Sequence, residues 1–192
     1  MNVRDAVHTK RAVREFADRP LAEADLAAIL EAGRRAHSAK NGQRWAFIVV
    51  RDRARLKQMA TLGPWCSHVG GAAAAVALVT PDPKAEDAPL SIMWDLGGAA
   101  AQMMLVAWEL GVGSCPATVY EADRARAVLG YPADMHCEFM LSFGYPANPD
   151  VLTKPNRAGG RKPAEDLVHR EAWSSVVQAE AGPTTEGGSS RS

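Results

Sequence analysis

The chain has 192 residues, with 22 basic and 22 acidic side chains and a formal net charge of zero at pH 7. At 47% hydrophobic and 23% charged residues, its composition is that of a soluble globular protein, and its length suits one domain. The balanced charge gives no overall reason to bind nucleic acid or an anionic membrane. No apolar run approaches the roughly 20 residues that span a bilayer, and no secretory signal is visible. We therefore expect a cytoplasmic protein with neither kind of partner.

Helical and strand patterns alternate along the chain. Apolar spacing predicts helices over residues 2–9, 21–36, 52–62, 90–110 and 121–129. Short apolar runs predict buried strands over 45–50, 72–79 and 137–144. This interleaving favours an α/β or α+β sandwich.

Two of these elements need comment. The run AAAAVALV at 72–79 suits a helix by composition, but its shortness between two glycines and a proline favours a strand. The helix over 90–110 is apolar on more than one side, which is typical of an interior or a subunit interface.

The end of the chain changes composition. Residues 179–192 are small and polar, which predicts a disordered tail after a single domain over 1–178. Cys66, Cys115 and Cys137 form no CxxC pair, which favours reduced thiols over a disulfide framework or a zinc site.

Two basic segments stand far apart in the sequence. HTKRAVR at 8–14 places three cations beside Val13 and Phe16, which would anchor the segment in a core. GGRKP at 159–163 carries a second basic pair after two glycines, and the helix-like pattern AEDLVHREAW follows it at 164–173. Either segment suits a phosphate group, since charge-assisted hydrogen bonds are strong. The alternatives are a solvated basic face and a surface linker.

Two further segments could contact a ligand. HSAKNGQRW at 37–45 is a polar loop before a strand, which is a common place for cofactor contacts, or a plain turn. GVGSCPAT at 111–118 permits close backbone approach to a flat ligand. It is not a dinucleotide fingerprint, because it follows a helix and Pro116 stands at the third glycine position. Asp95, near the start of the central helix, is either a surface carboxylate or a functional one.

Together these segments resemble the FMN-dependent nitroreductase family, also called the nitro/flavin reductase family. KRAVREF resembles its Arg-Arg-Ser-x-Arg-x-Phe opening, and HSAKNGQRW resembles its Pro-Ser-x-x-Asn-x-Gln-Pro-Trp motif. ELGVGSCP resembles the end of its dimer helix and the loop after it, and GRKPAEDLVH resembles its C-terminal Arg-Lys-Pro segment. The resemblance covers about residues 4–173, in the family's order.

The resemblance implies an α+β, three-layer sandwich: a small central, mainly antiparallel sheet flanked by helices, in an intertwined homodimer with FMN at the interface. By position, Lys10, Arg11, Ala12 and Arg14 would hold the phosphate, ribityl chain and pyrimidine end. Across the interface, Ser38, Ala39 and Asn41 would reach the flavin. The ring near N5 would be lined by Pro116, Ala117 and Thr118, and Arg161 would close on the phosphate. Thr118 could act through its hydroxyl, supporting one-electron steps, or through its backbone N–H alone.

The chain also departs from the family. Ala12 replaces a serine, and His37 and Arg44 replace two prolines. Larger members carry an Asn and a Lys where this chain has GPWCSHVGG, so that flavin contact is absent or is made by His68. The stretch 81–89 is short where larger members insert a helical lid.

The implied activity is transfer of hydride from NADH or NADPH to FMN, and of electrons to a nitroaromatic, a quinone or a similar small acceptor, in a ping-pong cycle. No side chain need act as an obligatory acid or base, and no metal is implied. One alternative is a specialised flavoenzyme on the same scaffold, similar to dehalogenases or dimethylbenzimidazole synthases. The other is a flavin-binding or regulatory module without rapid turnover.

Overall fold

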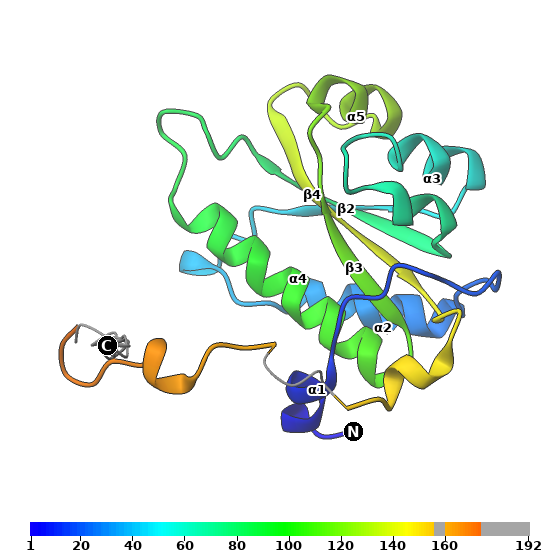
Figure 1. Ribbon diagram of the computed structural model, residues 1–192. Coiled ribbons are helices and arrows are strands. Elements are labelled where there is room, and N and C mark those ends of the chain that lie inside the picture. Colours follow the sequence, from blue (N-terminus) through cyan, green and yellow to red (C-terminus); the bar gives the residue numbers. More distant parts are fainter. Residues whose placement is uncertain (156–159, 174–192) are drawn as a thin grey trace, which may run out of the picture. The chain divides into compact units, whose positions relative to one another are not determined.

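A four-stranded antiparallel sheet organises the first part of the chain (Figure 1). The computed structural model describes residues 1–155 and 160–173. The chain divides into two units, Met1–Pro155 and Asn156–Ser192, and each is described by itself. The predicted single domain over 1–178 therefore stays a prediction, and the predicted tail, 179–192, lies outside the described residues.

The sheet has the order β1-β2-β4-β3, and every neighbouring pair is antiparallel. Its strands are β1 (Ala46–Val50), β2 (Ala74–Pro81), β3 (Gly113–Thr118) and β4 (Met135–Gly144). The helices are α1 (Val3–Thr9), α2 (Glu23–Arg34), α3 (Arg53–Met59), α4 (Ser91–Glu109) and α5 (Ala122–Leu129). Short 3-10 turns are η1 (Ala39–Asn41), η2 (Ser67–Gly71) and η3 (Pro149–Leu152). The α+β expectation is confirmed, and each predicted helix and strand in this unit forms.

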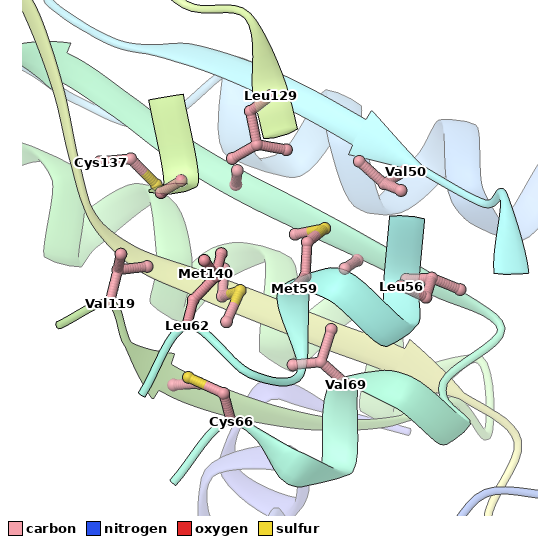
Figure 2. Packing of buried hydrophobic residues seen from close by; sticks show 14 of the residues in the cluster. Val50, Leu56, Met59, Leu62, Cys66, Val69, Val119, Leu129, Cys137 and Met140 are labelled. Atoms are coloured by element: carbon pink, nitrogen blue, oxygen red, sulfur yellow. The ribbon is translucent and has the colours of Figure 1, made fainter. Parts of the chain in front are cut away.

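Helices cover both faces of the sheet, so β2 is buried on both sides. Ala75, Ala77 and Val79 pack with α3 and α5 in one apolar cluster (Figure 2). Ala74, Val76 and Leu78 pack with α2 and α4 in the other. Successive side chains of a strand point to opposite faces, so a strand buried on both faces has no polar alternation. This explains the alanine-rich run and resolves its ambiguity in favour of a strand.

The stretch 111–118, expected as a loop after a helix, is partly a strand. β3 pairs with β4 from Gly113 to Thr118 and forms one edge of the sheet. Its composition, GSCPAT, has low strand propensity, and a proline normally argues against a strand. Pro116 is tolerated because β3 is an edge strand. The backbone of Pro116 faces away from β4, so its missing N–H removes no hydrogen bond between the strands.

The second unit contains one regular element among its described residues, the 3-10 turn η4 (Ala164–Asp166). The helix-like pattern predicted after Pro163 is therefore wrong. Leu167 and Val168 are both more than half exposed, so the segment lacks the burial that stabilises a short helix. Within the described ranges, no helix in either unit has the length and apolar character that crossing a membrane requires.

The N-terminal segment lies against two glycines that pair with each other across β3 and β4. Gly113 is the register partner of Gly144. A Cβ at Gly113 would lie 2.6 Å from Val13 Cβ, and a Cβ at Gly144 would lie 2.8 Å from Phe16 Cδ1. The absence of side chains at these positions lets the segment approach the sheet.

We expect Gly113→Ala to destabilise the protein by about 1–3 kcal/mol, the usual effect of overpacking, because the β-branched Val13 cannot rotate away. Urea denaturation measures the difference. Gly71→Ala is the matched control, since nothing lies within 4 Å of a Cβ there. Equal stability of the Gly113 and Gly71 variants would show that the contact does not hold the segment.

Candidate functional site

The basic N-terminal segment is fixed to the outer edge of β3. Ala12 forms a parallel bridge with Ser114, and the Val13 N–H donates to the Ser114 carbonyl at 3.0 Å. Figure 1 shows this segment running beside β3. Two motifs separated by about one hundred residues in sequence thus become neighbours.

The strand register leaves a stretch of β3 backbone facing outward. The Ser114 carbonyl accepts from Val13, and the Thr118 carbonyl accepts from the Cys66 thiol at 3.3 Å, both away from β4. Val119 donates instead to Glu138 of β4. Backbone groups alternate sides along a strand, so the Pro116 carbonyl and the Thr118 N–H also point outward. A flat ligand lying along this edge would find the Thr118 N–H as a donor, while the Pro116 carbonyl also faces the His68 imidazole.

Cations surround this edge. Lys10 Nζ lies 3.4 Å from Met104 Sδ of α4. Arg11 donates from Nε to the Thr9 carbonyl at 3.2 Å and from Nη2 to the Lys154 carbonyl at 2.5 Å. Burial raises the pKa of the Cys115 thiol, and the positive charges of Arg14 and Lys10 oppose that rise. The predicted basic cluster therefore lies beside the middle of β3.

A buried histidine lies beside the same strand. His68 of η2 is 8% exposed, and its Nδ1 lies 2.8 Å from Ser142 Oγ. The Ser142 hydroxyl also lies 3.2 Å from the Cys115 carbonyl, and the donor and acceptor roles of the two imidazole nitrogens depend on the tautomer. Among the described residues, buried Nε2 has no hydrogen-bond partner. Desolvation and the Arg14 charge lower the pKa of His68, while the Pro116 carbonyl partly opposes them.

An apolar pocket of about 240 Å³ adjoins the α4 side of this edge. Pro116 lines it from β3, and Met104, the contact of Lys10, lines it from α4. The other lining residues are Leu78, Met93, Leu96, Gly97, Ala100, Phe139 and Leu141. The strand edge therefore combines a polar backbone, nearby cations and an apolar surface.

The loop that follows α2 is strained and tied to α4. Lys40, Asn41 and Gln43 have φ angles of 53°, 53° and 46°. Left-handed geometry costs roughly 1–2 kcal/mol for an ordinary residue. The Ala39 N–H donates to Asp95 Oδ2 at 3.0 Å, and Asp95 is 4% exposed. Asp95 is thus a buried hydrogen-bond partner of this loop and not a surface carboxylate.

The structure brings some predicted site residues together and separates others. Gathered at the β3 edge are Lys10, Arg11, Ala12, Arg14, Pro116, Ala117 and Thr118. Ala117 points its side chain into the opposite core and can contribute only backbone there. Ser38, Ala39 and Asn41 adjoin Asp95, nine residues before Met104 on α4 and so roughly 14 Å away along the helix. Arg161 is in the second unit, so its role stays a prediction.

Sequence reasoning missed Ser142 and the role of Asp95. Ser142 is fully buried in β4 and gave no signal beyond being a polar residue in a strand. Asp95 did give a signal, because it is a charged residue among apolar side chains of a helix. A buried carboxylate needs a hydrogen-bond donor, which here comes from a loop 56 positions away.

Comparison with solved structures defines the class of protein. A Parabacteroides distasonis protein named "Putative NADH dehydrogenase/NAD(P)H nitroreductase" superposes with a TM-score of 0.77 at 22% identity, over 90% of this chain and all of that one. An FMN-dependent nitroreductase from Clostridium difficile gives 0.75 at 24% identity, over 88% and 99%. At these identities the likeness shows the fold, which is that of nitroreductases.

Sequence comparison then gives the family. The Nitroreductase family pattern matches residues 7–67 and 63–145. An Archaeoglobus fulgidus protein named "Putative NADH dehydrogenase/NAD(P)H nitroreductase" is 34% identical over 174 residues, 87% of this chain and 96% of that protein. A protein of the same name from Methanothermobacter thermautotrophicus is 29% identical over 180 residues, 90% and 88% of the two chains. The chain belongs to the Nitroreductase family, a flavin-dependent family of oxidoreductases.

The lowered pKa of His68 predicts a loss of stability in acid. Below pH 6.5 the unfolded chain binds a proton that the folded protein excludes, so the free energy of unfolding falls as pH falls. One such group contributes a slope of up to about 1.4 kcal/mol per pH unit. Urea unfolding between pH 7 and pH 5 measures it. His68→Gln should flatten the slope, and His8→Gln, at an exposed position of α1, is the control. An unchanged slope in His68→Gln would show that His68 is not the group excluded from protonation.

Proposed function

We propose that this protein is an NAD(P)H-dependent FMN oxidoreductase that reduces a nitroaromatic, a quinone or a similar small acceptor. The observation that carries the proposal is the docking of the basic N-terminal segment on the open edge of β3. It places cations beside outward-facing backbone groups and an apolar pocket, which are the features that an anionic, flat cofactor needs.

The residues present fit FMN. The buried His68 Nε2 lacks a hydrogen-bond partner among the described residues, and a buried polar nitrogen is expected to have one. FMN has an N–H and two carbonyl oxygens in its pyrimidine ring, which could pair with either tautomer of His68, and the Arg14 cation, which would favour the pyrimidine end, acts on the same histidine. This supports the alternative in which His68 makes the flavin contact that an Asn and a Lys make in larger members of the family.

Each segment has a distinct role in the proposal. Lys10 and Arg11 would bind the phosphate, and Arg161 would close on it. The Pro116–Thr118 edge would contact the ring near N5, with the outward Thr118 N–H as donor. The 38–41 loop would reach the FMN held mainly by the partner subunit, since it lies roughly 14 Å along α4 from the Lys10 contact.

The bound FMN would supply the redox chemistry, accepting hydride from NADH or NADPH and passing electrons on. The protein would bind it, orient it and stabilise negative charge at its pyrimidine end, chiefly through Arg14. NAD(P)H and the acceptor would use one exposed face in turn, as in a ping-pong cycle. The short 82–90 segment, which contains no regular element, leaves that face open unless the partner covers it.

We also propose that the protein is a homodimer with α4 at its interface. Leu90, just before α4, is fully exposed, and Trp94 is 76% exposed. Gly97 and Ala101 continue this face along the helix, and a hollow of about 360 Å³ lies beside Trp94. An exposed apolar helix face of this kind marks an interaction surface. This helix face is continuous with the 38–41 loop, which would reach the cofactor of the partner subunit.

The absorption spectrum of the purified protein is the first test, followed by anaerobic titration with NADH and with NADPH. We expect a flavin spectrum, one FMN per chain, bleaching by at least one nucleotide, and steady NAD(P)H oxidation with a quinone or nitroaromatic. Bound FMN without turnover would favour the regulatory-module alternative. Absence of flavin binding after incubation with FMN would refute the proposal.

The phosphate contacts predict the effect of removing two arginines. Arg11→Ala with Arg161→Ala should weaken FMN binding at least about 100-fold, since each charge-assisted hydrogen bond contributes roughly 1.5–3 kcal/mol. Flavin fluorescence titration measures the Kd. Arg124→Ala on α5, which removes a surface contact to Thr61, is the matched control. Full retention of FMN by the double variant would exclude these arginines as the phosphate site.

The interface predicts a dimer that depends on Trp94. Sedimentation should give twice the chain mass of 20.5 kDa for the wild type. Trp94→Glu should shift it toward monomer, because a charge buried in an apolar interface is strongly unfavourable. Trp65→Glu, at another exposed tryptophan, is the control. A wild-type protein that is monomeric with FMN bound would contradict the interface.

A further inference from the structure

The 38–43 loop has a shape that it would not keep by itself. Lys40 and Gln43 both have positive φ angles, although neither is a residue that tolerates the left-handed region well. Gly42, which would tolerate it, has a φ of −70°. Such backbone geometry persists only where the surroundings over-determine it. The contacts of the loop must therefore supply that constraint.

Several of these contacts lie within the loop itself. The Gln43 N–H donates to Ser38 Oγ at 3.0 Å, and the Gly42 N–H donates to the Ala39 carbonyl at 3.0 Å. The Gln43 side chain donates to Asn41 Oδ1 at 3.1 Å. These bonds fix the shape of the loop, but they would move with it and do not fix its direction.

Two contacts tie the start of the loop to α4. The Ala39 N–H donates to Asp95 Oδ2 at 3.0 Å. His37 packs on Gly98, where a Cβ would lie 3.3 Å from His37 Cε1. Asp95 and Gly98 are three residues apart and so lie on the same side of the helix. Of the two contacts, the buried Asp95 is the specific one, because a charged acceptor fixes both the distance and the direction of the Ala39 N–H.

We propose that Asp95 is a positioning residue: it holds the strained 38–43 loop on α4 so that Ser38, Ala39 and Asn41 present their polar groups to the FMN of the partner subunit. Asp95 acts from α4 through its hydrogen bond with the Ala39 N–H and does not itself bind the flavin. This inference rests on the proposed function, because it assigns the loop a flavin to contact.

The test compares Asp95→Ala and Asp95→Asn with Glu109→Ala, an exposed acid on the same helix. Lys40 and Arg44 are exposed trypsin sites within and just after the loop. In the holoprotein, Asp95→Ala should raise cleavage at these sites at least five-fold over wild type, and Glu109→Ala should leave it unchanged. Asp95→Asn keeps an acceptor oxygen and should give an intermediate rate. Cleavage at Arg124 and Arg126 on α5 reports general unfolding.

Flavin fluorescence gives the second readout. Asp95→Ala should weaken FMN binding about ten-fold, with partial rescue in Asp95→Asn. If Asp95→Ala does not fold, hydrogen exchange of residues 37–45 in Asp95→Asn replaces it, and exchange faster than wild type there, but not in α5, supports the inference. Unchanged loop cleavage or exchange overturns it, and so does unchanged FMN affinity with a loosened loop.

The two proposals fail in different ways. A wild-type protein that binds no FMN refutes the proposed function and, with it, the role assigned to Asp95. A wild-type protein that binds FMN, together with an Asp95→Ala variant of normal affinity and normal loop protection, refutes the positioning role alone.

Discussion

The site depends on the close approach of the N-terminal segment to the edge of β3. One backbone hydrogen bond, from Val13 to Ser114, and two glycines that pair across the strands make that approach possible. The segment places its cations at the β3 edge of the sheet, where Pro116 has no N–H to donate. Cations from residues 10–14 thus lie beside a strand about one hundred residues further along the chain, and the edge strand that could pair with another chain is partly covered by the same contact.

Helix α4 connects the other functional features. Its sheet side lines the apolar pocket through Met93, Leu96 and Met104, while its outer side exposes Trp94. Near its start Asp95 holds the strained loop, and further along Met104 contacts Lys10. A helix that is apolar nearly all round therefore has a distinct task on each side. In the proposed dimer, the same helix would orient the cofactor contacts of one subunit and carry the loop directed at the other.

Local patterns in the sequence were enough to predict most of the fold. Apolar spacing located the helices and three strands, because burial on one face or two leaves a periodic signature. β3 was not predicted because Gly113 and Pro116 are more typical of a loop than of a strand. The helix predicted after Pro163 does not form because its apolar residues stay exposed. The structure places the predicted basic cluster beside the β3 segment, and the role of both as site residues stays a prediction. The pairing of His68 with Ser142, and of Asp95 with Ala39, depends on contacts across 74 and 56 positions, which no local pattern encodes.

The three thiols are all free and buried, and burial raises the pKa of each, that of Cys137 to about 12. Cysteine reacts with oxidants and electrophiles as the thiolate, so these side chains remain protonated and unreactive at neutral pH. For a protein proposed to handle electrons, nitroaromatics and quinones beside Cys115, this matters chemically. These three cysteines offer the proposed substrates and products no thiolate to alkylate or oxidise, so the protein should withstand repeated turnover without losing its thiols.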